Sequence, residues 1–143
     1  MQKIKFNYAD RQLNIKGKKE IQALIPKVFT DENKKLKQIN YIFCSDNYLL
    51  DINKKHLNHN YYTDIITFDL SEDDNITAEI YISIDRVKEN AEVLDVPFFN
   101  ECLRVIIHGA LHLCGYKDKT AHQKLVMRDM EDQYMDEFLQ SKG

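Results

Sequence analysis

The segment that decides the fold lies within residues 98–118 and contains His108-Gly-Ala-Leu-His112-Leu-Cys-Gly115-Tyr-Lys-Asp118. Two histidines four positions apart lie on the same face of an α-helix, about 5–6 Å apart at Cβ, and can bind one metal ion. Gly115 is suited to the left-handed conformation that ends a helix. The turn that follows would return the Asp118 carboxylate to the histidines, so the segment predicts a metal site with three ligands.

A site with three protein ligands leaves a coordination position open, which is typical of catalytic rather than structural zinc. Two imidazoles and one carboxylate leave a divalent ion with a positive charge that acidifies a bound water. The expected nucleophile is therefore a metal-bound water, and no side chain is assigned as catalytic. His122 competes with Asp118 for the third position, while Cys114 lies two residues after His112 and points away from the shared face.

The same spacing occurs in metallopeptidases of the H-E-x-x-H type, whose general base directly follows the first histidine. Here that position is Gly109, which cannot transfer a proton. A small metallopeptidase is therefore the weakest interpretation of the segment.

Length and composition favour one folded domain over residues 1–143, with 43% hydrophobic residues and no linker-like tract. No apolar run approaches the roughly 18–20 residues that span a membrane, and the first residues do not resemble a signal peptide. We expect a cytoplasmic location and no membrane partner. Three cysteines without a CxxC pair argue against a disulfide framework and favour buried free thiols.

The net charge of −3 conceals an asymmetry along the chain. Residues 1–60 carry twelve Lys and Arg against six Asp and Glu, whereas residues 61–143 carry eight against seventeen. A basic half can form a patch for a polyanion, but composition alone favours the simpler explanation, a solvated lysine-rich surface.

Hydrophobic periodicity predicts an α+β fold, a mixed four-stranded sheet packed with about five helices, whose strand order it leaves open. We expect Asp46, Ser83 or Asp85, and Thr120 to cap three of the helices. The apolar face of the last helix should consist of Leu125, Val126, Met130, Tyr134 and Phe138. The predicted strands cover residues 4–8, 38–44, 63–70 and 76–83, the last two antiparallel, and the predicted helices cover residues 18–29, 47–56, 84–94, 97–114 and 121–138.

The segment from His108 to Tyr116 resembles the signature of the YbeY family of metal-dependent endoribonucleases. Weaker matches precede it in the same order: Ile52-Asn53, Thr63-Asp-Ile-Ile-Thr-Phe68 and Glu79-Ile-Tyr-Ile-Ser83. The resemblance implies a zincin-like fold with the metal site on a central helix and the turn after it.

The resemblance also implies a function: cleavage of single-stranded RNA in ribosomal RNA maturation, at the 3′ end of 16S rRNA, and in ribosome quality control. The implied partners are single-stranded RNA and the small ribosomal subunit. The implied cofactor is one divalent ion, expected to be zinc, with no small-molecule cofactor.

This sequence departs from the family pattern at two positions. The family's third histidine aligns with Asp118, and two histidines with one carboxylate are also a ligand set for non-haem iron(II). The arginine usual in the loop before the third strand is Leu57 here.

Lys54, Lys55 and His59 are candidates to supply the missing positive charge toward the substrate. Lysine lacks the bidentate fork of arginine, and exposed lysines at a helix end are common without any such role. The missing arginine also supports an alternative function, a non-catalytic RNA- or ribosome-binding assembly factor with a structural metal.

Overall fold

The computed structural model describes residues 3–142 and confirms the α+β prediction, with four strands and five helices in this part of the chain. The elements follow one another as β1 (Ile4–Tyr8), α1 (Lys18–Asp31), β2 (Lys35–Cys44), α2 (Asp46–Leu57), β3 (Ile65–Asp69), β4 (Asn75–Ser83), α3 (Ile84–Leu94), α4 (Phe98–Leu113) and α5 (Ala121–Lys142).

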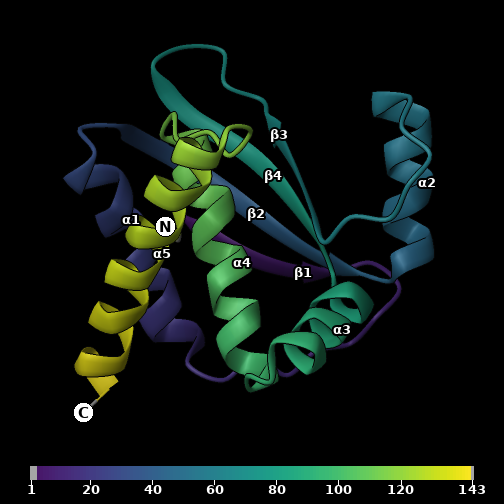
Figure 1. Cartoon of the computed structure of the whole chain (residues 1–143). Coiled ribbons are helices and arrows are strands. Elements are labelled where there is room, and N and C mark those ends of the chain that lie inside the picture. The colour runs from purple at the N-terminus through teal and green to yellow at the C-terminus, as the bar shows by residue number, and fades with distance from the viewer. Residues whose placement is uncertain (1–2, 143) are drawn as a thin grey trace.

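The strands form one mixed sheet in the order β1-β2-β4-β3 (Figure 1). The pairs β1/β2 and β2/β4 are parallel, whereas β3 pairs with β4 antiparallel, as predicted for two strands joined by a short acidic turn. The hairpin places β3 at the edge of the sheet, where only one side of the strand is paired.

The two faces of the sheet bury different side chains because successive residues of a strand point in opposite directions. Ile80 and Ile82 of β4 pack into the main core, together with α1, α3, α4 and α5. Tyr81 lies between them in sequence and packs on the opposite face, in a smaller cluster around Leu49 of α2. Figure 1 shows α2 apart from the other helices, at one end of the sheet.

Helix α4 approaches the sheet closely at Gly109, where a Cβ atom would lie 2.9 Å from Ile80 Cδ1 and 3.0 Å from Ile65 Cδ1. One turn earlier, the buried Tyr41 hydroxyl on β2 donates to the Ile106 carbonyl over 2.9 Å. These contacts fix the helix that carries both site histidines against β2, β3 and β4.

The helix caps settle the alternatives that the sequence left open. Ser83 caps α3 by accepting from the Arg86 amide, and Thr120 accepts from the Gln123 amide at the start of α5. The predicted cap of α2 at Asp46 is wrong, because Ser45 accepts the Tyr48 amide instead. The Asp46 carboxylate accepts from the Ser83 hydroxyl and the Arg86 guanidinium, so it is engaged outside its own helix.

The buried face of α5 matches the predicted one at Tyr134 and Phe138 and differs from it at Leu125. Leu125 is 65% exposed, whereas Met127, Glu131, Tyr134 and Phe138 are buried. The apolar pattern also gave no indication of Glu131, a charged residue that lies on the same buried face.

All three cysteines, Cys44, Cys102 and Cys114, are buried and free, as expected, and burial raises the pKa of each to about 12. Across residues 3–142, no helix combines the length and apolar character that crossing a bilayer requires.

We expect Gly109→Val to lower the free energy of unfolding by about 1–3 kcal/mol, because a branched side chain must enter space already filled by Ile80 and Ile65. Urea denaturation measures this change, and Gly109→Ala is the matched control with the smaller volume. Equal midpoints for Val and wild type would show that the helix can move away from the sheet without cost.

Candidate metal and RNA site

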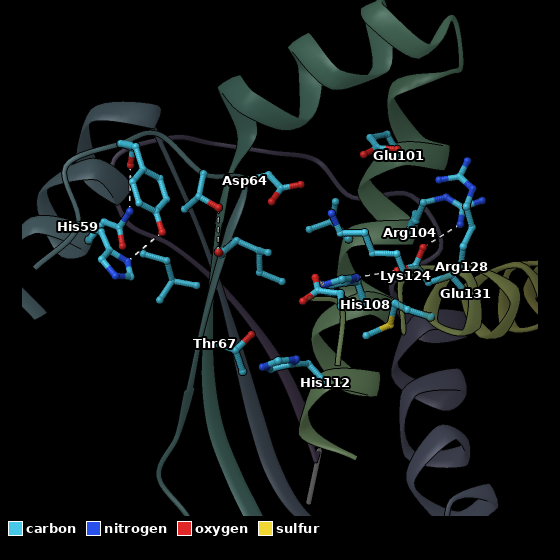
Figure 2. A pocket seen from close by; sticks show the side chains of 18 of the residues that line it. His59, Asp64, Thr67, Glu101, Arg104, His108, His112, Lys124, Arg128 and Glu131 are labelled. Carbon is cyan, nitrogen blue, oxygen red and sulfur yellow. Dashed lines mark hydrogen bonds and ion pairs between the residues drawn. The ribbon is translucent and has the colours of Figure 1, made fainter. Parts of the chain in front are cut away.

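A cavity of about 720 Å³ opens between α4, α5, the edge strand β3 and the loop after α2 (Figure 2). His108 and His112 line it from α4, facing Asp64 and Thr67 of the β3 side. The remaining lining residues come from these segments, from α2 and from the turn after α4: Asn53, Leu57, His59, Tyr61, Thr63, Ile65, Ile66, Glu101, Arg104, Val105, Asp118, Lys124, Met127, Arg128 and Glu131.

The α4 wall follows from helical spacing. Glu101, Val105, His108 and His112 recur at intervals of three or four residues, so they form one stripe facing the cavity. Gly109 lies beside this stripe, at the contact with the sheet. The spacing of the histidines therefore places both imidazoles on one wall, as the sequence predicts.

The turn after α4 has the hydrogen bonds of a Schellman motif. The Tyr116 amide donates to the Leu111 carbonyl and the Gly115 amide to the His112 carbonyl, with Gly115 at φ 107°. A side chain at Gly115 would be strained by this positive φ. The predicted helix end at Gly115 is confirmed, and the turn directs the following residues toward the cavity.

The turn and α5 provide partners for both imidazoles. His108 Nδ1 donates to the Glu131 carboxylate over 2.7 Å, and His108 Nε2 lies 3.2 Å from Asp118 Oδ2. His112 Nδ1 donates to the Tyr116 carbonyl over 3.1 Å. Each ring is thus oriented through Nδ1, which leaves Nε2 as its remaining nitrogen.

This arrangement fits a metal in two respects. Histidine ligands in metal sites commonly donate the other ring N–H to a carboxylate or a carbonyl, and both histidines do so here. Two ligand atoms about 2.0–2.1 Å from a tetrahedral ion lie about 3.3 Å from each other, close to the separation between His108 Nε2 and Asp118 Oδ2.

The geometry brings two of the three predicted ligands together and leaves the third apart. His112 lines the same cavity, but no three His, Cys, Asp or Glu side chains within residues 3–142 converge closely enough to hold one ion. The assignment of His108, His112 and Asp118 as ligands stays a prediction.

The charges around His108 set its protonation. Burial acts to lower the pKa of its imidazole, but the Glu131 hydrogen bond and the charges of Glu131, Asp118 and Asp64 outweigh burial and raise the pKa. Glu131 is itself 5% exposed and also accepts from Arg104, whose second nitrogen pairs with Asp132. A connected row of charges therefore runs from Asp132 to Asp118.

Two further carboxyl groups border the cavity. Burial raises the pKa of Asp64, and burial together with the charge of Asp64 raises that of Glu101. Asp64 also accepts a 3.3 Å hydrogen bond from Asn90. The environment of both groups therefore disfavours the charged form of the carboxyl relative to water.

The remaining predicted residues divide by location. His59 lines the cavity, whereas Lys54 and Lys55 do not, and Lys55 pairs with Asp51 within α2. His122 is exposed outside the cavity lining, and Cys114 is buried in the main core. The substrate roles of Lys54, Lys55 and His59 stay predictions.

Sequence reasoning missed Glu131 and Asp64, which approach the histidines only through tertiary packing. It also missed Arg104, which lies one helical turn before His108 on α4. For Glu131 a signal existed, since a glutamate one helical turn from Met127 and three residues before Tyr134 lies on the apolar stripe of its helix. A charge in that position requires a buried partner.

Comparison with known proteins identifies the family of the chain that forms this cavity. The sequence model described as endoribonuclease YbeY matches residues 4–139. The chain belongs to the YbeY family. Endoribonuclease YbeY of Flavobacterium psychrophilum is 50% identical over 130 residues, covering 91% of this chain and 92% of that protein.

Two further comparisons also cover most of this chain. Endoribonuclease YbeY of Karelsulcia muelleri is 53% identical over 108 residues, covering 76% of this chain and 77% of that protein. A solution structure of a Thermotoga maritima protein superposes with a TM-score of 0.66 at 26% identity, covering 96% of this chain and 90% of the other. The YbeY resemblance of the histidine segment is thereby confirmed for most of the chain.

We expect Glu131→Gln to lower the pKa of His108 in the metal-free protein, because the Glu131 charge contributes to raising it. NMR titration of the imidazole measures this shift. Asp132→Asn is the matched control, since Asp132 pairs with Arg104 but has no contact with His108 among those observed.

The same pair predicts a pH dependence of stability. Because the pKa of His108 is raised in the folded state, its protonated imidazole stabilises that state. This stabilisation is complete below the ordinary histidine pKa of about 6.5 and is lost as pH rises through the higher pKa of the folded state. The stability difference between wild type and Glu131→Gln should therefore be larger at pH 6 than at pH 8.5. An equal difference at both values would contradict the coupling between Glu131 and His108.

Proposed function

We propose that this chain is a metal-dependent endoribonuclease that cleaves single-stranded RNA during ribosomal RNA maturation in the cytoplasm. The observation that carries the proposal is the His108–Asp118 pair, supported by Glu131, on the wall of a large cavity in a YbeY-family chain. The ribosomal small subunit, including the 3′ end of 16S rRNA, is the proposed source of the substrate, and ribosome quality control is part of the same proposal.

His108, His112 and Asp118 would hold the ion, and zinc is proposed because it accepts two imidazoles and one carboxylate. A divalent ion in such a site acidifies water and offsets charge on a phosphodiester. The chain's own contribution is orientation, through Glu131 on one ring and the Tyr116 carbonyl on the other. Iron(II) accepts the same ligand set, and metal analysis of untagged protein distinguishes the two ions.

Two cations of α5 are suited to hold the RNA backbone. Lys124 and Arg128 line the cavity one helical turn apart, and neither forms an ion pair within residues 3–142. Arg104, by contrast, is paired with Glu131 and Asp132. Lys124 and Arg128 can therefore bind phosphate oxygens without first breaking an ion pair, while the charge of Glu101 also acts on Arg128.

The alternative function, a non-catalytic assembly factor that binds RNA or the ribosome, has one specific observation in its favour. Leu57, at the position where the family usually has arginine, lines the cavity with an apolar side chain. An uncharged residue there gives no support to a phosphate, so this wall of the cavity can bind RNA without assisting its cleavage.

We expect purified protein to cleave a single-stranded RNA oligonucleotide, with cleavage lost on chelation and restored by zinc. His112→Ala should reduce the rate by at least about 100-fold, the scale of losing one ligand or its support. His122→Ala is the matched control, an exposed histidine outside the cavity, and should leave the rate unchanged.

Gel analysis of end-labelled RNA measures both variants. RNA that is bound by the wild-type chain but left intact, with and without added metal, would favour the assembly-factor alternative. Cleavage that survives His112→Ala would instead contradict the proposed ligand set.

A further inference from the structure

Two exposed rings on the loop after α2 are held in a fixed pair. The rings of His59 and Tyr61 stack with centroids 5.1 Å apart and planes 21° apart, and the Tyr61 hydroxyl and His59 Nδ1 share a 2.9 Å hydrogen bond. Tyr61 nevertheless remains 55% exposed. The pair is ordered by its own contacts while much of the tyrosine faces solvent.

A buried asparagine fixes the backbone under the pair. Asn53 is 1% exposed, and its side-chain Nδ2 donates to the Tyr61 carbonyl over 2.9 Å. The main-chain carbonyl of Asn53 accepts from the His59 amide over 3.0 Å. Asn58 between them adopts a left-handed conformation with φ 57° and ends α2. The loop is therefore anchored by polar contacts, and burial in a core does not account for its aromatic residues.

The pair lies on the cavity wall opposite the histidine helix. His59 and Tyr61 both line the cavity that His108 and His112 line from α4. Figure 2 shows His59 on the far side of β3 from His108, with Asp64 and Thr67 between them. A chain lying across the cavity would meet the rings on one side and the proposed metal ligands on the other.

We propose that the His59–Tyr61 pair is a stacking platform for one unpaired base of the RNA, positioned so that the neighbouring phosphate faces His108 and His112. This inference rests on the proposed function. A base in a duplex has both faces covered by its neighbours. An unpaired base can instead swing out of the stack of neighbouring bases and stack on an aromatic side chain. The platform would therefore select single strands and position the phosphate to be cleaved.

The geometry distinguishes this platform from the other exposed aromatic residues nearby. Tyr62 lies against the Arg86 guanidinium, 5.2 Å from its ring centroid, and Tyr48 is on α2; neither lines the cavity. Tyr48 is 40% exposed, which makes it a matched control of similar size and accessibility.

The test uses the full chain in chelator with single-stranded RNA octamers that each carry one 2-aminopurine or lack one base. Tyr61→Ala should weaken binding about 5- to 20-fold, the lower part of the range for loss of one stacked base, and should reduce quenching of 2-aminopurine. Tyr61→Phe retains the ring and should bind within about twofold of wild type, and Tyr48→Ala should match wild type.

A double-mutant cycle assigns the loss to stacking. The effect of Tyr61→Ala should disappear on the octamer that lacks the stacked base and persist on the others. An unchanged affinity of Tyr61→Ala, or an equal loss on every abasic octamer, would overturn the platform. Circular dichroism of each variant checks that the fold is retained.

The same samples separate this inference from the nuclease proposal once metal is restored. Tyr61-dependent stacking on RNA that is never cleaved supports the platform and contradicts the nuclease. If the Tyr61→Ala variant binds the RNA with wild-type affinity and cleaves it at the wild-type rate, the nuclease proposal stands and the platform is contradicted.

Discussion

The hydrogen bond between His108 and Glu131 joins the two longest helices, α4 and α5, at the wall of the cavity. A buried carboxylate is tolerated only when its charge is balanced, and Glu131 is balanced by Arg104 on one oxygen and His108 on the other. The packing of α5 is thus tied to the orientation of a single imidazole. Structural stability and the geometry of the site depend on the same three side chains.

Local patterns predicted most elements of the fold correctly. Alternating and helical apolar spacing are properties of neighbouring residues, so the strands and helices could be read directly from the sequence. The strand order β1-β2-β4-β3 depends on pairings between distant segments, which no local pattern encodes. For α5 the predicted face was right at Tyr134 and Phe138 and wrong at Leu125, which faces solvent, and the buried charge of Glu131 was not expected there.

The candidate site likewise has one part that local sequence spacing could indicate and another that it could not. His108 and His112 share a helix, and Gly115 marks the turn that brings Asp118 back, so spacing alone could indicate them. The opposite wall, with Asp64 and the paired rings of His59 and Tyr61, comes from β3 and the loop before it. Only the packing of the sheet edge against α4 brings these groups to the histidines.

The cavity combines groups of both signs in a way that suits a polyanion. Its carboxyl groups are paired, as for Asp118 and Glu131, or have raised pKa values, as for Asp64. Lys124 lines the same space without an ion pair among the described residues. The electrostatic character of the site therefore depends on how each carboxyl group is paired or buried as well as on the overall acidic charge of the protein.

The Schellman turn at Gly115 separates the residue at position 118 from the helix that precedes it. The backbone path is fixed by Gly115 and two main-chain hydrogen bonds, none of which depends on the side chain at position 118. During evolution, one codon change there can exchange a carboxylate for an imidazole while the scaffold stays intact. Such an exchange alters the chemistry of the cavity wall without any change to the helix or the turn that carries it.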